Sequence, residues 1–436
     1  MFLALCAWSI YEALCALGQI LGLGISGNAR FAMTGNFLNP GPLGGFLAIS
    51  MGVTFSYIFK FRKRCRGLYR KIMMTAACTA FALCFVIFPA TLSRTAWLAF
   101  GVALLAALLQ DDSARLWARR HKKTVVVLGA AAVLLFAGAF FLKKDSAIGR
   151  LHIWRIECLA ILKNPLGTGP GSVLGTYGKV QEEFFREHLE DVSDSVVEVA
   201  GCPEYAFNEY LHIGIEYGIV GALIFASLLA AAIIILVRHR SIYAGGLIAW
   251  AVFALASYPL SVPRIDILLG ILLASAAFCI PFPAPARHLA AAICIAAGII
   301  VCVRSVGRPE FRAIYDKGYN EFRFGEYENS IRTLSEGADI SSDPLFHVIM
   351  GRDYEALGNV EAAEEQYYIA RYMVPCRIYP LARLTRLYVR NGRDEDALEC
   401  AETALNMSVN ERHLNMVRLR DELSVTRDSL KCLLRK

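Results

Sequence analysis

The hydrophobic residues of this chain gather in long runs separated by short polar segments. Up to residue 304 the runs are roughly 17–25 residues long, the length that a bilayer requires of a helix. The nine runs cover residues 2–25, 43–60, 72–92, 95–110, 124–142, 208–237, 242–260, 265–282 and 288–304. The remainder is rich in charge and has the pattern of a soluble segment. The pattern predicts an all-α fold with two domains, a polytopic membrane helical bundle over 1–304 and a soluble domain over 305–436.

Basic residues are concentrated in two of the loops between these runs. Seven Lys or Arg residues lie in 60–71 and five in 111–123. Because cytoplasmic loops carry an excess of Lys and Arg, both loops should be cytoplasmic. The first run has no basic flank and no small-residue cleavage site, so it reads as a span. With an odd number of spans, the large loop 143–206 and the domain 305–436 are expected outside, which in a bacterial inner membrane is the periplasm.

Composition narrows the classes of function. The net charge is +7, but the basic residues that produce it sit in membrane-orienting loops, so we expect no nucleic-acid partner. Many of the thirteen cysteines lie inside apolar runs, where cysteine acts as a small hydrophobic residue, and no CxxC pair is present. The sequence therefore predicts neither a metal site nor a cofactor.

The soluble domain contains an internal repeat. Gly325, Gly358 and Gly392 are 33 and 34 residues apart. The small residues that follow each glycine by twelve positions are Gly337, Ala370 and Ala404. This period is typical of tetratricopeptide repeats, in which glycine allows a tight turn between antiparallel helices. We therefore predict an α-solenoid of tetratricopeptide repeats, with 411–436 as its capping helix.

Two segments predicted to be external carry residues that lipid-facing helices do not need. TGNFLNPGPLGGF at 34–46 contains Asn36 and is either an interhelical turn or a loop that lines a substrate site. TLSRTAW at 91–97 places Arg94 between two apolar runs. A guanidinium at the start of a helix is suited to bind a diphosphate, although an arginine there can also reach to the lipid headgroups.

The segment 149–173 is expected to form a helix and then a glycine-rich turn. Arg150, Trp154 and Cys158 recur every four residues and would share one helix face, whereas Arg155 faces elsewhere. The following NPLGTGPG either offers backbone amides to an anion or serves as a simple turn.

The chain then becomes acidic before it returns to the membrane. Residues 182–204 are interpreted as a solvated amphipathic helix, with a divalent-metal site as the alternative. The segment 206–225 begins with polar residues near the expected membrane surface, and such residues are functional candidates. They are Asn208, Glu209, His212 and Glu216. Asn208 can also serve as a helix cap.

Taken in this order, these segments resemble the O-antigen ligase and O-antigen polymerase superfamily, whose members have a GT-C-like membrane fold. TGNFLNPG resembles the family's Gly-Phe-Asn-Pro loop, and SRTAW its Ser-Arg-x-Ala-Trp segment. Arg150 and Trp154, followed by NPLGTGPGS, resemble its Arg-x-x-x-Trp and Pro-Leu-Gly-x-Gly run. The residues that match the closing pattern are Asn208, Tyr210, Leu211, Glu216, Gly218 and Gly221. The resemblance covers residues 30–260, and fewer spans precede the first motif than is usual, as in a shortened relative or a sequence that starts late.

The resemblance implies a reaction and roles for residues. The donor would be a glycan on undecaprenyl diphosphate, bound by Arg94 and Arg150, with Arg155 assigned beside them and no metal required. The residues assigned to the substrate loops are Asn36, Trp154, Asn208 and Glu216. Where many members have the histidine proposed as catalytic base, this chain has Phe207. His212, four residues beyond Asn208 and thus on its helix face, is our candidate base, with Glu209 as second choice.

The acceptor hydroxyl remains open among lipid A core, a growing glycan and protein Ser or Thr. The repeats favour a protein acceptor or another protein partner. Membrane lipid is expected to surround the helical bundle. Two alternatives to a ligase are a non-catalytic scaffold for envelope glycan assembly and a glycan polymerase or transporter. A scaffold would tolerate loss of Arg94, and a transporter would show a pseudo-repeat in its membrane half.

Overall fold

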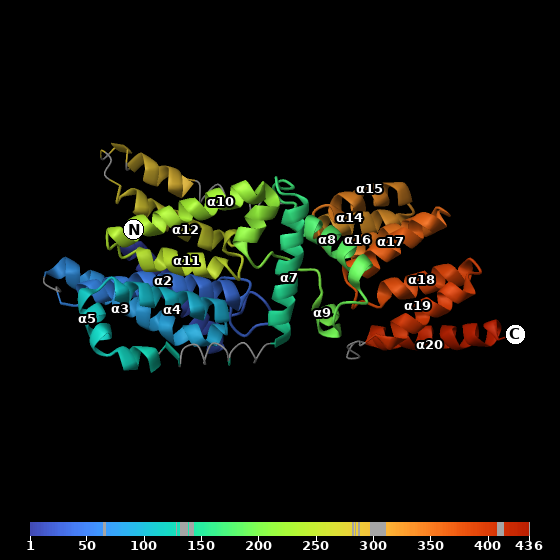
Figure 1. The fold of residues 1–436 in the computed structure, drawn as a ribbon, viewed down its shortest axis with the longest axis horizontal. Coiled ribbons are helices and arrows are strands. Elements are labelled where there is room, and N and C mark those ends of the chain that lie inside the picture. Colours follow the sequence, from blue (N-terminus) through green and yellow to red (C-terminus); the bar gives the residue numbers. More distant parts are fainter. Residues whose placement is uncertain are drawn as a thin grey trace. The chain divides into compact units, whose positions relative to one another are not determined.

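The computed structural model describes residues 1–63, 67–127, 144–280, 288–296, 311–407 and 414–435, with positions 129, 130, 138, 283, 285 and 286. Throughout these residues the long regular elements are helices and no strand occurs (Figure 1). The all-α prediction is confirmed. The chain divides into two compact units. Unit 1 comprises Met1–Lys143, Phe207–Tyr210 and Gly221–Arg308, and unit 2 comprises Lys144–Ala206, Leu211–Val220 and Pro309–Lys436.

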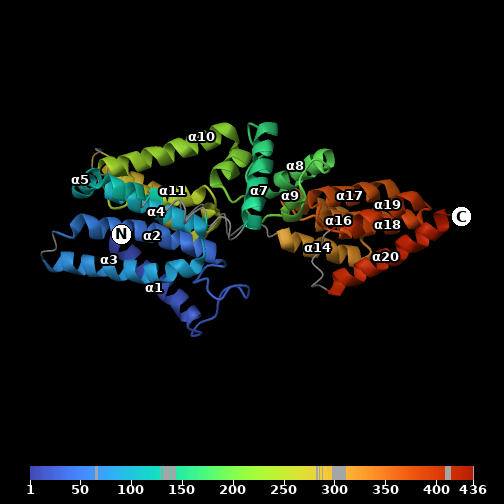
Figure 2. The same cartoon turned by 60° about the horizontal axis from the view of Figure 1, so that its bottom comes forward.

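Unit 1 is built around a central helix. Its helices are α1 (Phe2–Ile20), α2 (Pro40–Phe61), α3 (Leu68–Ile87), η1 (Phe88–Thr91), α4 (Arg94–Leu109), α5 (Asp112–Arg120), most of α10 (Glu209–Arg238), α11 (Ala244–Ala254), η2 (Pro259–Ser261) and α12 (Pro263–Ala277). The buried helix α2 packs against α3, α4 and α11 (Figures 1 and 2). Glycines permit this approach, since a Cβ on Gly52 would lie 2.9 Å from the carbonyl group of Gly245.

Several helices of unit 1 suit a bilayer. Within the described residues, four helices are long and apolar enough to cross a membrane, namely α1, α2, Leu68–Thr91 and α10. A fifth is counted if α4 and α5, bent by 96°, form one span. The multi-pass membrane prediction is confirmed at this level. The predicted span at 124–142 falls largely outside the described residues, and the one at 288–304 is described only as far as residue 296.

Two other predicted spans are shorter than expected. The runs 242–260 and 265–282 form α11 with 11 residues and α12 with 15 residues. They are joined by η2, which begins at Pro259, and α12 begins at Pro263. Because each proline lacks the amide hydrogen that a continuing helix needs, the helix is interrupted here although the apolar residues continue.

Unit 2 combines the predicted external loop with the predicted repeat domain. Its helices are α7 (Lys144–Lys163), α8 (Val173–His188), α9 (Asp194–Val199), α14 (Phe311–Phe324), α15 (Tyr327–Ala338), α16 (Leu345–Ala356), α17 (Val360–Met373), α18 (Tyr379–Arg390), α19 (Asp394–Asn406) and α20 (Leu414–Leu434). Helix α8 packs against α17. The acidic stretch 182–204 is not one helix as expected, because the chain turns after His188 and Ser193 has an extended backbone before α9.

The repeat glycines occupy the positions that their spacing predicts. Gly325, Gly358 and Gly392 lie at the turns of the pairs α14–α15, α16–α17 and α18–α19, with φ of 82°, 78° and 70°. This conformation is unfavourable for residues with a Cβ. A Cβ on Gly337 would overlap the ring of Phe346, so α15 and α16 also approach closely. The assignment to the tetratricopeptide family stays a prediction.

Candidate functional site

Polar side chains of α1 hold the loop that precedes α2. The Gln19 Oε1 atom accepts hydrogen bonds from the amides of Thr34, at 2.9 Å, and Gly35, at 2.8 Å. Its Nε2 atom donates to the Gly35 carbonyl at 2.9 Å. Asn39 then caps α2 by accepting from the Gly41 amide at 2.8 Å. The Asn36 region is thus a built loop with defined partners.

A buried carboxylate organises the same loop. Glu12 is 1% exposed, and its Oε2 atom accepts from the backbone amide of Asn36 at 3.3 Å and from its side-chain amide at 3.1 Å. Arg264, on the first turn of α12, places its Nε atom 3.6 Å from Glu12 Oε1. Its guanidinium lies 5.5 Å from the centroid of the Phe37 ring. Asn36, a predicted substrate-loop residue, is therefore held beside an arginine that sequence reasoning missed.

Arg94 is the first residue of α4. The chain turns sharply just before it, since Leu92 has a left-handed backbone with φ of 49°. A Cβ on Gly44 of α2 would lie 2.9 Å from the Ser93 Cβ, so α2 and α4 begin side by side. Arg94 therefore lies at a helix N-terminus, where the helix dipole favours anions. The same end of unit 1 also carries the Asn36 loop. Its role in diphosphate binding stays a prediction.

Residues before α10 have special backbone and cap geometry. Phe207, which occupies the position of the family histidine, has φ of 55° and meets the Tyr258 ring edge-on at 5.4 Å. The Asn208 Oδ1 atom accepts from the Tyr210 amide at 3.0 Å. This is the capping role that the sequence offered as an alternative for Asn208. The Tyr210 hydroxyl donates to the Ala251 carbonyl at 3.0 Å, which fixes the start of α10 on α11.

Two further carboxylates are buried in unit 1. Glu209 is 1% exposed and accepts from the Leu260 amide at 2.7 Å. Asp266 on α12 is 2% exposed, and neither of its carboxylate oxygens has a hydrogen-bond partner in the described part of the chain. Ionisable groups inside an apolar bundle are functional candidates. The signal that could have revealed Asp266 is its position as the only acid in the apolar run 265–282.

Within unit 2, the first turns of α10 bring together two predicted site residues. The His212 Nε2 atom lies 3.3 Å from Glu216 Oε1, and the two side chains are 14% and 3% exposed. The same Glu216 oxygen accepts from the Gly171 amide at 2.7 Å. A histidine oriented by a carboxylate that is itself held in place has the geometry of a general base.

The glycine-rich loop 164–171 wraps around a break in α10. The break lies at Gly218, with φ of 73° and ψ of −179°, and a Cβ there would overlap the Pro165 carbonyl. The amides of Gly167, Thr168 and Gly169 donate to backbone carbonyls at 2.9, 2.8 and 3.0 Å. Because these amides serve the chain itself, the structure supports the turn interpretation over an anion cradle.

Helix α7 confirms the predicted helix but turns a different face inward. Its buried side chains include His152 and Glu157, whereas Arg150 and Trp154 are half-buried. His152 Nε2 lies 2.9 Å from Gln181 Oε1, and burial lowers the pKa of His152. The Arg155 guanidinium lies 4.6 Å from the centroid of the Phe184 ring on α8. This cation–π contact gives Arg155 a packing role, and its assignment to diphosphate stays a prediction.

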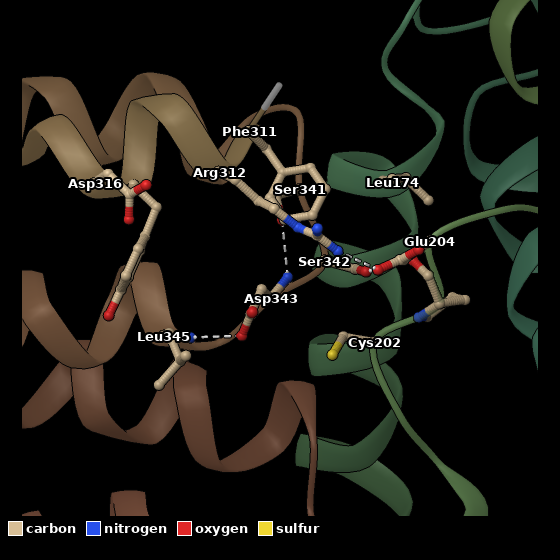
Figure 3. Close-up of a pocket in the computed structure, with 12 residues that line it drawn as sticks. Leu174, Cys202, Glu204, Phe311, Arg312, Asp316, Ser341, Ser342, Asp343 and Leu345 are labelled. Atoms are coloured by element: carbon tan, nitrogen blue, oxygen red, sulfur yellow. Dashed lines mark hydrogen bonds and ion pairs between the residues drawn. The ribbon is translucent and has the colours of Figure 1, made fainter. Parts of the chain in front are cut away.

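Unit 2 also contains a cavity of about 240 Å³ that no sequence motif marks (Figure 3). Figure 3 shows Arg312 of α14 reaching to Glu204, and the two side chains form an ion pair of 2.8 Å. Asp343, also in the lining, accepts from the Leu345 amide at 3.1 Å and pairs with Arg377 at 3.3 Å. These residues are far apart in sequence, which explains why no local pattern found them.

Comparisons with solved structures returned similarities that are limited to part of the chain. A Yersinia enterocolitica type III secretion chaperone, SycD, in complex with a peptide of the translocator YopD is 17% identical, covering 29% of this chain and 94% of that chain with a TM-score of 0.27. The Yersinia enterocolitica translocator chaperone SycD in a second structure is 14% identical, covering 31% and 95%, with a TM-score of 0.29. No curated protein matches the chain.

A family model matches the part of the chain that contains most of the motifs. The matched segment contains Arg94, Arg150, Trp154, Asn208 and Glu216. The match covers residues 79–226, and the family is described as O-antigen ligase. This part of the chain is therefore similar to the O-antigen ligase family, and the similarity supports glycan transfer or ligation as the class of reaction.

Proposed function

We propose that this protein transfers a glycan from undecaprenyl diphosphate to an acceptor hydroxyl at the periplasmic face of the inner membrane. The observation that carries the proposal is the His212–Glu216 pair, with its 3.3 Å contact and its tie to Gly171 inside the O-antigen ligase segment. A base positioned by a carboxylate is what an attacking hydroxyl needs.

The proposed reaction balances as a single displacement. The acceptor oxygen forms a bond to the anomeric carbon, and its proton passes to the imidazole of His212. The bond between the anomeric carbon and the diphosphate oxygen breaks, and the electron pair leaves with the lipid diphosphate. Arg94 and Arg150 are proposed to stabilise the charge that grows on this oxygen, which is the type of contribution that usually dominates catalysis. Glu216 stabilises the imidazolium and fixes its orientation.

Mass spectrometry of lipid-linked glycans and glycoconjugates, with and without the gene, tests the proposal. We expect the lipid-linked glycan to accumulate and one product to disappear when the gene is removed. Arg94→Ala and Arg150→Ala should each lower transfer roughly ten- to a hundredfold, because a hydrogen bond to a charged group contributes about 1.5–3 kcal/mol. Lysine should rescue poorly because it lacks the planar fork.

Arg119→Ala is the matched control, since it removes an exposed arginine from the loop predicted to face the cytoplasm. Equal loss in this control would indicate a general effect on the membrane protein. Normal transfer in both Arg94→Ala and Arg150→Ala would contradict the mechanism.

The acceptor is proposed to be a protein, recruited through the helices of unit 2, with lipid A core and a growing glycan as the other outcomes of the same experiment. The presence of Phe207 at the family histidine position favours one second candidate, a non-catalytic scaffold for envelope glycan assembly. If the protein is a scaffold, product levels should be unchanged in the arginine variants and should fall only when the protein itself is absent.

A further inference from the structure

A second cavity lies in unit 1 where α2, α4 and α10 end. Its volume is about 340 Å³. The lining residues come from three segments of the chain, the end of α2, the α4–α5 connection and the turn after α10. The charged residues in the lining are Lys60, Arg62, Lys63, Arg240, Asp111 and Asp112. Four cations against two carboxylates leave an excess of two positive charges, so the cavity suits an anion.

The two carboxylates are already engaged. Asp111 Oδ1 accepts from the Ala114 amide at 2.8 Å and so caps α5, and its other oxygen lies 3.4 Å from Arg62 Nη2. Asp112 is shared between Arg240, at 3.2 Å, and Arg115. The carboxylates therefore orient the cations of the cavity without neutralising all of them.

Arg240 occupies a backbone position that normally favours glycine. Its φ is 48°, and it ends α10 in the pattern of a Schellman motif, with Ser241 N bonded to Leu236 O at 2.8 Å and Arg240 N to Val237 O at 3.0 Å. An arginine here is strained in the folded state. Its carbonyl accepts from Lys60 Nζ at 2.6 Å. The Arg240 guanidinium contacts Asp112 at 3.2 Å, yet its side chain is still 56% exposed, so it can also donate to an anion in the cavity.

The surroundings of the cavity fit a lipid. Helix α5 is bent by 96° from α4, as expected for a helix that leaves a span and follows the membrane surface. On α5, Leu116 and Trp117 are 56% and 48% exposed, and on α4 Leu105 and Leu109 are 56% and 54% exposed. Apolar side chains beside a basic cavity provide places for acyl chains and for a phosphate.

We propose that this cavity binds the headgroup phosphate of an anionic phospholipid, with the acyl chains along the exposed faces of α4 and α5. Its residues lie in and beside the two loops that the positive-inside rule places in the cytoplasm, where anionic lipid headgroups are available. The inference is independent of the proposed function, because the cavity shares no residue with the His212 and Arg94 sites.

Native mass spectrometry of the delipidated full-length protein, titrated with phosphatidylglycerol or phosphatidylcholine, tests the site. We expect the wild-type protein to retain more phosphatidylglycerol than phosphatidylcholine. Phosphatidylglycerol should raise its melting temperature, and phosphatidylcholine should not. Arg240→Gly should weaken phosphatidylglycerol binding about tenfold. Because glycine relieves the strained backbone, the variant should melt without lipid at the wild-type temperature or above it.

Lys71→Gln is the matched control, because it removes an exposed cation from the first turn of α3, in the basic segment 60–71 but outside the cavity. It should bind phosphatidylglycerol as the wild type does. Equal retention of both lipids, or equal loss in the Arg240→Gly and Lys71→Gln variants, would overturn the proposal. A melting temperature raised as much by inorganic phosphate as by phosphatidylglycerol would also overturn it, because the site would then bind free anions.

Discussion

Glu216 is the residue on which the proposed chemistry most depends. It contacts His212 and accepts the Gly171 amide with the same oxygen, and its side chain is only 3% exposed. A buried carboxylate in this position can hold the imidazole in one orientation and compensate the charge that it acquires. Removal of the charge at constant shape should therefore impair the base without disturbing the fold.

The first prediction compares three conservative changes. His212→Gln and Glu216→Gln should each lower transfer by about tenfold or more. Glu209→Gln should retain transfer, because a glutamine side-chain oxygen can still accept from the Leu260 amide. Product quantification in cells at matched protein levels is the measurement. Glu187→Gln, an exposed change on α8, serves as the control. Full activity in the His212 and Glu216 variants would show that another residue is the base, and Glu209 and Asp266 would be the next residues to test.

Asp353 gives a second prediction at this scale. It is fully buried, its Oδ2 atom accepts from the Ser330 hydroxyl at 2.7 Å, and burial raises its pKa from 3.8 to about 6. The folded state thus holds a proton that the unfolded chain releases, so this contribution to stability is present below about pH 4 and lost as the pH rises through about 6. At neutral pH the raised pKa of Asp353 therefore lowers the free energy of unfolding by roughly 3 kcal/mol.

Asp353→Asn removes the charge and should raise the melting temperature of the full chain at pH 8, with a smaller change at pH 5. Thermal unfolding at the two pH values measures this difference. Glu395→Gln, an exposed change on α19, should leave the pH dependence as it is in the wild type. A larger gain at pH 5 than at pH 8 would show that the pKa of Asp353 is not raised in the folded protein.

At the scale of the elements, the break in α10 shapes the candidate site. Gly218 has a positive φ, and the loop 164–171 passes so close that a Cβ would overlap the Pro165 carbonyl. The Ile219 amide donates to that carbonyl at 3.0 Å. The break therefore lets the loop reach α10 and present Gly171 to Glu216.

Gly218→Ala should lower both stability and transfer. The backbone of Gly218, with φ of 73° and ψ of −179°, is essentially restricted to glycine and costs a residue with a Cβ about 1–3 kcal/mol. The overlap must also displace the loop that holds Glu216. Gly101→Ala on α4 is the control, because a Cβ there has no neighbour within 4 Å. Melting temperature and product yield should fall only in the Gly218 variant, and an unchanged Gly218→Ala protein would show that the loop position does not matter.

At the scale of the whole molecule, the topology is testable with a native residue. Cys432 on α20 is exposed, and the charge pattern predicts that its domain is periplasmic. An impermeant thiol reagent should label Cys432 in intact spheroplasts. A cysteine introduced as Lys71→Cys, in the loop predicted to be cytoplasmic, should be labelled only after lysis. The reverse labelling pattern would show that the chain has the opposite orientation in the membrane.

The sequence alone determined the features that depend on local pattern. Apolar runs predicted α1, α2, α3 and α10, and the repeat spacing located the glycine turns of the soluble domain. These predictions succeed because the length of an apolar run and the conformational freedom of glycine act within a few residues of the chain. The family segment was recognised for the same reason, since each motif is short and the motifs follow a fixed order.

The tertiary structure decided the features that join distant segments. Asn36 and Arg264 both contact Glu12 in the structure, and the Arg155 guanidinium lies over the Phe184 ring. The tertiary structure also folded the loop after α7 into one unit with the helices beyond residue 309. No local period encodes these arrangements, because a buried carboxylate or guanidinium takes its partner from whichever segment the packing of helices brings within hydrogen-bond distance.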